Sequence, residues 1–254
     1  MPEQDSSPDS LQLADELVEK FGGDSVVEDI TGALKGFACY KRRDEAVSMV
    51  FPDYDPGVHK FKIGIRQSSI TQSLPPVFSA TLVYPGGKEE SRLLPAKAYL
   101  QIVAASNFKQ RSRMSMLYYH AERLHYAVVG TPNKHEVEQG FFVKFGDGGA
   151  DVMPIAPYYK SQVYQLAENL GIPRGIIERT PTTDTYTAEQ TQEEFFYQLP
   201  FDLMDLFWYG WENRYDPEEV GEVMGYTKSE VENVFRSFDR KRKTTEYLRT
   251  TPIF

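Results

Sequence analysis

Apolar residues recur at helical spacing in several parts of the chain, and each of these parts is expected to form an amphipathic helix. The segments are residues 9–21, 32–40, 96–124 and 158–170. Glycine or proline follows the first and the last of them, as is typical of helix ends. Two start signals, Asp216-Pro217 and the capping box Thr227-Lys228-Ser229-Glu230, predict that residues 200–254 form a helical C-terminal extension.

Residues 44–95 have a different pattern, in which apolar and polar side chains alternate as they do along a half-buried strand. The alternation is clear in residues 59–66 and again in residues 78–84. The turn sequence Pro85-Gly86-Gly87-Lys88 follows, and residues 92–94 continue after it. We expect a β-rich insertion here rather than a separate domain.

A short strand of another kind is expected at residues 126–129, which are continuously apolar. Such a run is typical of a parallel sheet that is covered on both faces. Val26 and Val27 are expected to open a further short strand. A helix, a buried strand and more helices in succession indicate an α/β fold with a parallel sheet.

The composition bounds the class of protein. The 254 residues suit a single domain spanning residues 1–254, and 41% of them are hydrophobic, enough for a real core. The formal net charge of -9 argues against free DNA or RNA as a partner, because such proteins neutralise phosphates with Lys and Arg. No apolar run approaches the ~20 residues that span a bilayer. The polar, acidic N-terminus is no signal peptide, so we expect a cytoplasmic protein.

The densest chemical signal lies in residues 128–160. Residues 128–136 read as a strand, a turn and a helix start, and ligands of open α/β sheets bind beyond the carboxyl ends of strands. Thr131 and Glu136 would lie at such an end. Residues 146–151 then pack two acids among small residues, between Lys144 and Lys160.

Each of these residues also has a plainer interpretation. A Gly-Asp-Gly-Gly run is most often a turn, and Glu136 alone is more often a solvated helix residue than a metal ligand. The neighbouring His135 is expected on the surface. Arg111 and Arg113 are equally compatible with the solvent side of their helix.

The order and spacing of these pieces resemble the NAD synthases, a branch of the adenine nucleotide α-hydrolase fold. The family stretch reads Gly-Thr-x-x-Lys-x-Glu and then Gly-[Tyr/Phe]-[Tyr/Phe]-x-Lys-[Tyr/Phe]-Gly-Asp-Gly-Gly-Ala-Asp, and residues 130–136 and 140–151 meet every position. Residues 107–114 resemble its Asn-x-Lys-Ala-Arg-x-Arg-Met, with Gln110 in place of a small residue. The resemblance is loose over residues 1–43, close over residues 107–200 and weak in the tail.

The resemblance implies a doubly wound, mainly parallel sheet that lacks its first strand and phosphate loop. The family's Ser-Gly-Gly-x-Asp-Ser loop, which cradles the ATP pyrophosphate, occurs nowhere in the 254 residues. We therefore expect an N-terminally truncated chain that is poorly soluble or oligomeric and makes NAD slowly or not at all. An upstream segment of ~50 to 90 residues carrying the loop would rescue it.

The resemblance also implies the reaction. The nicotinate carboxylate of deamido-NAD would attack ATP to give an adenylate and pyrophosphate, and ammonia would then displace AMP. Ammonia would be free or come from a separate glutaminase, because the chain has no Cys nucleophile with acid and base partners. The family implies a homodimer, and the helix at residues 96–124 offers aromatic residues for its interface.

The site residues follow from the same resemblance, with Mg²⁺ as the cofactor and ATP as a co-substrate. Glu136 would bind Mg²⁺, which prefers hard oxygen ligands. Asp147 would lie near the reacting carboxyl and orient or deprotonate ammonium, and residues 182–188 would close as a lid. ATP would be bound by Thr131, Lys160 and Thr182, and Lys160 would also act in catalysis. Deamido-NAD would be bound by Arg113, Lys144 and Asp151.

Three other hypotheses remain. A related ligase would amidate another carboxylate, with the insertion reshaping the acceptor pocket. A catalytically inactive relative or partner subunit would also lack the phosphate loop. Residues 216–243 resemble a DNA-binding helix-turn-helix in outline, but their seven acids against six bases argue against that role.

Overall fold

A computed structural model describes residues 1–7, 9–65, 68–71, 77–183 and 185–252. The N-terminal half contains three helices, a three-stranded sheet and a long helix. In order these are α1 (Asp9–Phe21), α2 (Thr31–Gly36), α3 (Cys39–Ser48), β1 (Lys60–Ile65), β2 (Phe78–Val83), β3 (Glu89–Leu93) and α4 (Ala96–Leu124). The other half is helical. Its elements are α5 (Lys134–Gln139), α6 (Lys160–Asn169), α7 (Arg174–Ile177), the π-helix η1 (Glu193–Tyr197), α8 (Phe201–Glu212), α9 (Pro217–Met224), α10 (Lys228–Thr244) and α11 (Glu246–Arg249).

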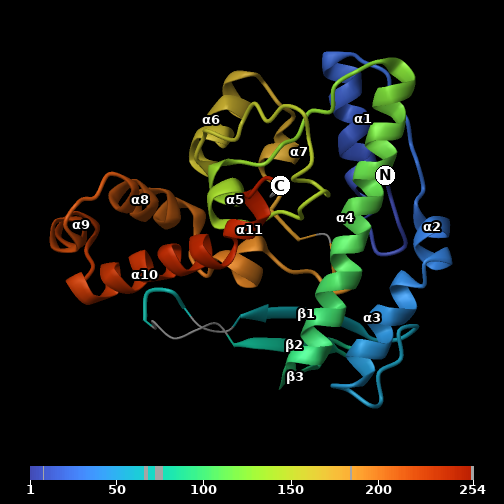
Figure 1. Cartoon of the computed structure of the whole chain (residues 1–254), viewed down its shortest axis with the longest axis horizontal. Helices are drawn as coiled ribbons and strands as arrows, with labels where there is room; N and C mark the ends of the chain where they lie inside the picture. The colour runs from blue at the N-terminus through green and yellow to red at the C-terminus, as the bar shows by residue number, and fades with distance from the viewer. Residues whose placement is uncertain (8, 66–67, 72–76, 184, 253–254) are drawn as a thin grey trace.

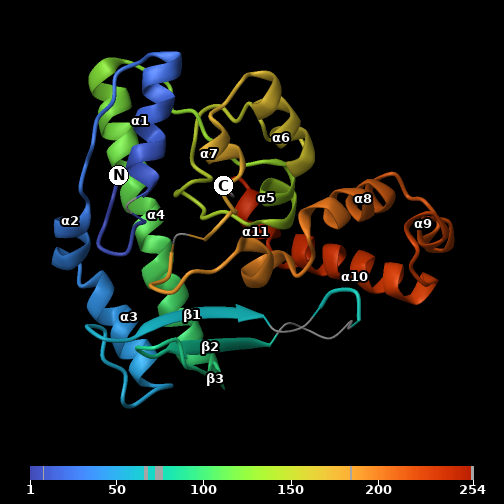
Figure 2. The ribbon, with the colours of Figure 1, turned by 180° about the vertical axis from the view of Figure 1, so that it is seen from behind.

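Helix α4 runs along one side of the molecule, with α1 beside its C-terminal half and the sheet at its N-terminal end (Figures 1 and 2). Its bounds are those predicted from the apolar pattern, and it ends at His125, whose backbone is left-handed with φ 60°. Helix α1 also forms as predicted, but none of its residues is buried. Helix α1 and the three-stranded sheet therefore both lie along the long helix α4.

The sheet confirms the alternating pattern of residues 44–95. Its order is β1-β2-β3, and both pairings are antiparallel. Phe61 faces Leu82 and Ile63 faces Ala80 across the first pairing, and all four side chains are buried. They form one core with residues of α3 and α4. Gly86 and Gly87 close the turn before β3, both with positive φ near 85°.

The expected parallel sheet is not formed by the described residues. Residues 126–129 make one isolated parallel bridge, between Val129 and Val152, instead of an extended strand. Val26 and Val27 form no strand, and both are more than half exposed. The physical reason is pairing: a parallel strand needs hydrogen-bonded neighbours along its length, and residues 126–129 have one such partner segment in the described chain.

One predicted helix is split in two. The pattern of residues 32–40 predicts a single helix, but α2 ends at Gly36 and α3 begins at Cys39. Between them Ala38 is left-handed, with φ 55°. The break turns the chain so that Leu34, Cys39 and Tyr40 all enter one small core.

The C-terminal helices form an arm on the side of the molecule away from α4 (Figure 1). The predicted start signals are confirmed: Asp216 accepts a hydrogen bond from the Glu218 N–H, and Thr227 forms a capping box with Glu230. A second core, centred on Trp208 and Phe238, fills the space between α8 and α10. In the described part of the chain, none of the helices has the length and apolar character that a membrane crossing requires.

Candidate functional site

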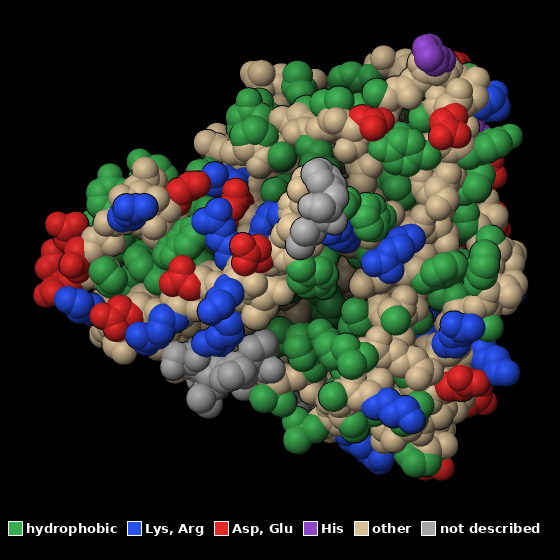
Figure 3. All heavy atoms as spheres, in the orientation of Figure 1, with side chains coloured by type: hydrophobic (Ala, Val, Ile, Leu, Met, Phe, Trp, Pro, Cys, Tyr) green, Lys and Arg blue, Asp and Glu red, His purple; other side chains and the backbone are tan. Residues whose placement is uncertain are grey.

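A cavity of about 490 Å³ lies between α4, the glycine-rich loop, the segment before η1 and the C-terminal residues 245–248. Glu136, Lys144 and Asp147, three of the residues predicted from the sequence, line it together. Its volume is within the range of small-molecule sites. Figure 3 shows the molecular face hollowed between the α4 side and the side of α5 and α11, with hydrophobic and basic side chains around the hollow.

Eight aromatic side chains and four charged ones line the cavity. The ring-bearing side chains are Tyr99, Phe141, Phe142, Phe145, Tyr186, Phe195, Phe196 and Tyr247. The charged ones are Arg111, Glu136, Lys144 and Asp147. Flat rings offer stacking surfaces, and a few charged groups fix the orientation of a ligand. The arrangement therefore suits a ligand with an aromatic ring and an ionised group.

The glycine-rich loop presents Asp147 to the cavity. The Val143 N–H donates to Asp147 Oδ1 at 2.9 Å, which fixes the carboxyl inside the loop. A Cβ on Gly148 would lie 2.2 Å from the Phe142 ring, so no larger residue fits there. The carboxyl is surrounded by neighbouring atoms although the residue has an exposed flank, and this desolvation raises the pKa of Asp147. A carboxylate of raised pKa is suited to take up a proton.

Glu136 has two roles in the structure. Asn133 caps α5, and Glu136 Oε2 accepts from the Asn133 N–H at 2.7 Å, which completes a capping box. Burial raises the pKa of Glu136, while the Asn133 N–H and nearby Lys160 oppose that rise. Glu136 therefore completes the cap of α5 and also lines the cavity.

A magnesium ion would fit this site in one particular way. No group of three or more His, Cys, Asp or Glu side chains is placed to hold a metal within the ranges that the structure describes. Magnesium is usually held by one or two carboxylates together with water and substrate phosphates. Glu136 could therefore be the single protein ligand of a magnesium ion that binds together with a nucleotide. The described residues do not provide a site in which protein side chains alone coordinate the ion.

Lys144 lies under the C-terminal segment. Its Nζ donates to the carbonyl oxygens of Tyr247 at 2.9 Å and Thr250 at 2.8 Å. The same segment is held by Arg249, which donates to Val137 O at 3.1 Å. No local sequence pattern predicts this contact, because Tyr247 and Thr250 lie 103 and 106 residues from Lys144.

The other predicted residues lie outside the wall of the cavity. Lys160, the first residue of α6, has its ammonium 5.4 Å from the centre of the Phe201 ring. Thr131 is exposed, and Thr182 pairs with Thr191 in an isolated antiparallel bridge. The structure therefore divides the predicted residues into a central group and an outer group.

Two of the outer residues already have structural partners. Asp151 accepts from the Val128 N–H at 2.8 Å and from the Tyr118 hydroxyl at 2.9 Å. Arg113 donates to Met1 O and Ser6 Oγ, both at 3.3 Å. These contacts tie the outer group to the bridge at Val129 and to the N-terminal segment.

The predicted lid rests on the insertion. The Phe61 N–H of β1 donates to Thr187 Oγ1 at 2.8 Å, and the Ala188 N–H donates to Phe61 O at 3.0 Å. Tyr186, which directly precedes Thr187, is buried and lines the cavity. Asp184, which belongs to the predicted lid, lies outside the described residues. The edge of β1 thus supports one wall of the site.

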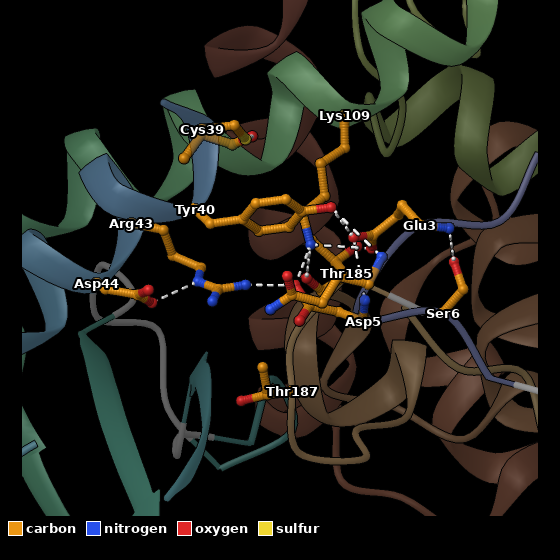
Figure 4. Close-up of polar contacts among 12 residues, drawn as sticks. Glu3, Asp5, Ser6, Cys39, Tyr40, Arg43, Asp44, Lys109, Thr185 and Thr187 are labelled. Carbon is orange, nitrogen blue, oxygen red and sulfur yellow. Dashed lines mark hydrogen bonds and ion pairs between the residues drawn. The ribbon is translucent and has the colours of Figure 1, made fainter. Parts of the chain in front are cut away.

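A buried ionic cluster, defined as Glu3, Asp5, Tyr40, Arg43 and Lys109, lies behind the lid (Figure 4). Lys109 Nζ is 2.6 Å from Asp5 Oδ2 and 3.1 Å from Glu3 Oε1, and it also donates to Thr185 O at 3.3 Å. Arg43 pairs with Asp5, and the Tyr40 hydroxyl donates to Glu3. Burial and the hydrogen bond to Glu3 raise the pKa of Tyr40. The motif at residues 107–114 contains Lys109, but its acidic partners could not be identified from the sequence.

His135 corrects one prediction. It was expected on the surface, but it is fully buried, and its Nε2 is 2.5 Å from Asp205 Oδ1. The reason is a partner from a distant helix: Asp205 of α8 supplies the hydrogen bond that a buried imidazole needs. His135 also packs edge-on against the Trp208 ring.

Comparisons with known proteins agree with the motifs of the chain. A family model described as NAD synthase matches residues 87–252. The NH(3)-dependent NAD(+) synthetase of Rhizobium meliloti (strain 1021) is 48% identical over 99% of this chain and 75% of its own length, and that of Mesorhizobium japonicum is 47% identical over 100% and 79%. The solved structure of an NMN synthetase from Francisella tularensis has a TM-score of 0.58 at 21% identity, covering 100% of this chain and 75% of that one, which is a likeness of fold.

Proposed function

Because this chain belongs to the NAD synthase family, we propose that it is an ATP-dependent carbon–nitrogen ligase that makes NAD from deamido-NAD and ammonia. The nicotinate carboxylate attacks the α-phosphorus of ATP, which releases pyrophosphate and leaves an adenylate. Ammonia then attacks the activated carbonyl, and AMP leaves. The observation that carries the proposal is the aromatic cavity that gathers Glu136, Lys144 and Asp147.

Residues in and around the cavity bind the dinucleotide and ammonia. Asp147, with its raised pKa, holds ammonium and takes its proton as the amine attacks. Lys144, Arg113 and Asp151 hold the dinucleotide, and the aromatic wall stacks against its rings. The lid residues 182–188 keep water from the adenylate.

Three residues of the outer group, Lys160, Thr131 and Thr182, serve ATP. Lys160 faces the triphosphate and balances the charge that develops there, with Thr131 and Thr182 beside it. Glu136 holds Mg²⁺, which supplies further positive charge to the phosphates when bound. The parallel pairing of Val129 and Val152 corresponds in this proposal to the parallel sheet of adenine nucleotide α-hydrolases.

The activity is tested by AMP release that depends on both deamido-NAD and ammonia. The assay is run on the 254-residue chain and on the same chain expressed from the nearest upstream in-frame start. Nicotinate mononucleotide as the alternative acceptor and glutamine as the alternative nitrogen donor are the controls. Absence of ammonia-dependent NAD formation from both forms would contradict the proposal.

Two lysines are expected to divide between the two substrates. Lys144→Ala should raise the KM for deamido-NAD by roughly tenfold or more, because a charge-assisted contact is lost, and leave that for ATP nearly unchanged. Lys160→Ala should do the reverse. Steady-state kinetics with each substrate varied in turn measures both effects, and equal effects on the two KM values would show that the assignment is wrong.

We further propose that the protein works as a homodimer and takes ammonia either free or from a separate glutaminase. Helix α4 leaves Leu100, Leu117 and Tyr119 exposed, which offers an apolar surface for a second copy. Light scattering at micromolar concentration tests the homodimer. The source of ammonia is tested by comparing the rate of NAD synthesis with glutaminase and glutamine to the rate with glutamine alone.

A further inference from the structure

Helix α8 carries two carboxylates that each bridge the same pair of helices. Asp205 and Glu212 are seven residues apart and so project from one face of α8. Asp205 Oδ1 is hydrogen-bonded to His135 of α5, and its Oδ2 accepts from the Ser161 N–H of α6 at 2.8 Å. Each of its oxygens therefore holds a different helix.

Glu212 repeats this arrangement two turns further along. Its Oε1 is 2.7 Å from Lys134 Nζ at the start of α5, and its Oε2 accepts from the Tyr159 hydroxyl at 2.8 Å. Tyr159 is the N-cap residue of α6. The two carboxylates, named here the α8 clamp, thus hold the N-terminal ends of α5 and α6 at four points.

The clamped residues flank the groups proposed to serve ATP. Lys134 and His135 directly precede Glu136, and Tyr159 and Ser161 stand on either side of Lys160. Neither Asp205 nor Glu212 lines the cavity. The clamp therefore acts on the site through the positions of two helix ends and not by contact with a ligand.

The charge state of the clamp suits this role. Burial by itself raises the pKa of Asp205, but the hydrogen bonds from His135 and Ser161 outweigh it and hold the pKa below its usual value. Burial likewise raises the pKa of Glu212, but the contacts with Lys134 and Tyr159 together outweigh it and lower the pKa. Both carboxylates are therefore ionised at neutral pH, and ionised acceptors form the stronger hydrogen bonds.

We propose that Asp205 and Glu212 are positioning residues that set the distance between Glu136 and Lys160 and thereby the affinity of the site for Mg·ATP. The inference rests on the proposed function, which assigns Glu136 and Lys160 to ATP. It gives the C-terminal helices a part in the reaction, although they lie outside the segment that most closely resembles the family.

The test compares three variants. Asp205→Ala should weaken the binding of Mg·ATP, measured by calorimetry in the absence of deamido-NAD, and raise the KM for ATP, both by about tenfold, the effect of losing a supporting carboxylate. The KM for deamido-NAD should not change. Glu212→Gln should raise the KM for ATP by roughly twofold to fivefold, because its ion pair is partly exposed. Asp239→Asn is the matched control: Asp239 of α10 accepts from Trp211 Nε1 of α8 at 3.2 Å, and none of its described hydrogen bonds or ion pairs reaches α5 or α6.

A purely structural role gives a different result. It lowers the active fraction and hence the rate, but leaves both KM values unchanged, and that outcome would overturn the inference. Should Asp205→Ala fail to fold, Glu212→Gln decides, because the Glu212 side chain is 39% exposed and its substitution disturbs the core less. Combining Glu212→Gln with Lys160→Ala should add nothing to the KM for ATP of Lys160→Ala alone, and full additivity would also overturn it. Failure of the proposed function itself is seen separately, as an inactive unsubstituted protein.

Discussion

Glu136→Gln is expected to lower AMP release by on the order of 100-fold or more, the loss typical of one preorganised charge at a reacting phosphate. The amide cannot supply the negative charge that Mg²⁺ requires from its protein ligand. Its carbonyl oxygen can still accept from the Asn133 N–H, as Glu136 Oε2 does at 2.7 Å, so α5 keeps its cap. The substitution therefore separates the chemistry of the residue from its structural role.

The thermal stability of the Glu136→Gln variant should change little, and the direction of the change follows from the pKa of Glu136. Burial raises the pKa of Glu136, so the folded state holds the proton more tightly than the unfolded state does. An acid of this kind costs stability at a pH above its folded-state pKa, and that cost disappears as the pH falls through this value. Gln carries no charge, so the melting temperature of the variant at neutral pH should be unchanged or slightly higher.

The matched control is Glu138→Gln, the same substitution two residues along α5. Glu138 pairs with Arg242 at 3.1 Å on the surface, and it does not line the cavity. AMP release and thermal unfolding are measured for both variants. A Glu136→Gln protein that keeps its activity but melts earlier would show that the residue serves only the helix cap.

Local sequence signals predicted the local structure well. Helix α4 has the bounds that its apolar pattern predicts, and the strands of residues 44–95 follow their alternation, with β2 and β3 joined by the short turn that Gly86 and Gly87 predict. Errors arose where a distant partner decides the outcome. Residues 126–129 are apolar enough for a buried strand, but a strand is defined by its neighbours, and the described chain pairs them at one bridge.

The candidate site shows the same division. Glu136, Lys144 and Asp147 were found through the spacing of one continuous stretch, and the structure brings them to one cavity. The partners that the sequence did not reveal come from far along the chain. Tyr247 is 103 residues from Lys144, and Asp205 is 70 residues from His135. A single sequence carries no signal for such contacts, and a lone His next to a motif does not show which helix will cover it.

Lys109→Met is expected to cost about 3–5 kcal/mol of the free energy of unfolding, the usual result of removing one partner from a buried ion pair. The Lys109 side chain is 2% exposed, and the partner carboxylates of Glu3 and Asp5 are 0% and 4% exposed. Without the ammonium, Arg43 still pairs with Asp5, but Glu3 keeps no cation among its described contacts. Thr185 O also loses a donor, so the lid loosens together with the N-terminal segment.

The electrostatic cause can be separated from the loss of packing by also neutralising the carboxylates that Lys109 contacts. A triple variant with Lys109→Met, Glu3→Gln and Asp5→Asn leaves no uncompensated carboxylate in the cluster, and Arg43 keeps its ion pair with Asp44 at 2.8 Å. It should recover part of the lost stability, since fewer buried ions are then desolvated. Lys97→Met is the control, because Lys97 is an exposed lysine of the same helix. Urea denaturation measures all three, and Lys97→Met should change the free energy of unfolding by less than about 0.5 kcal/mol. If Lys109→Met costs no more than this control, or if the triple variant is less stable than the single one, the cluster is not the electrostatic anchor that its geometry indicates.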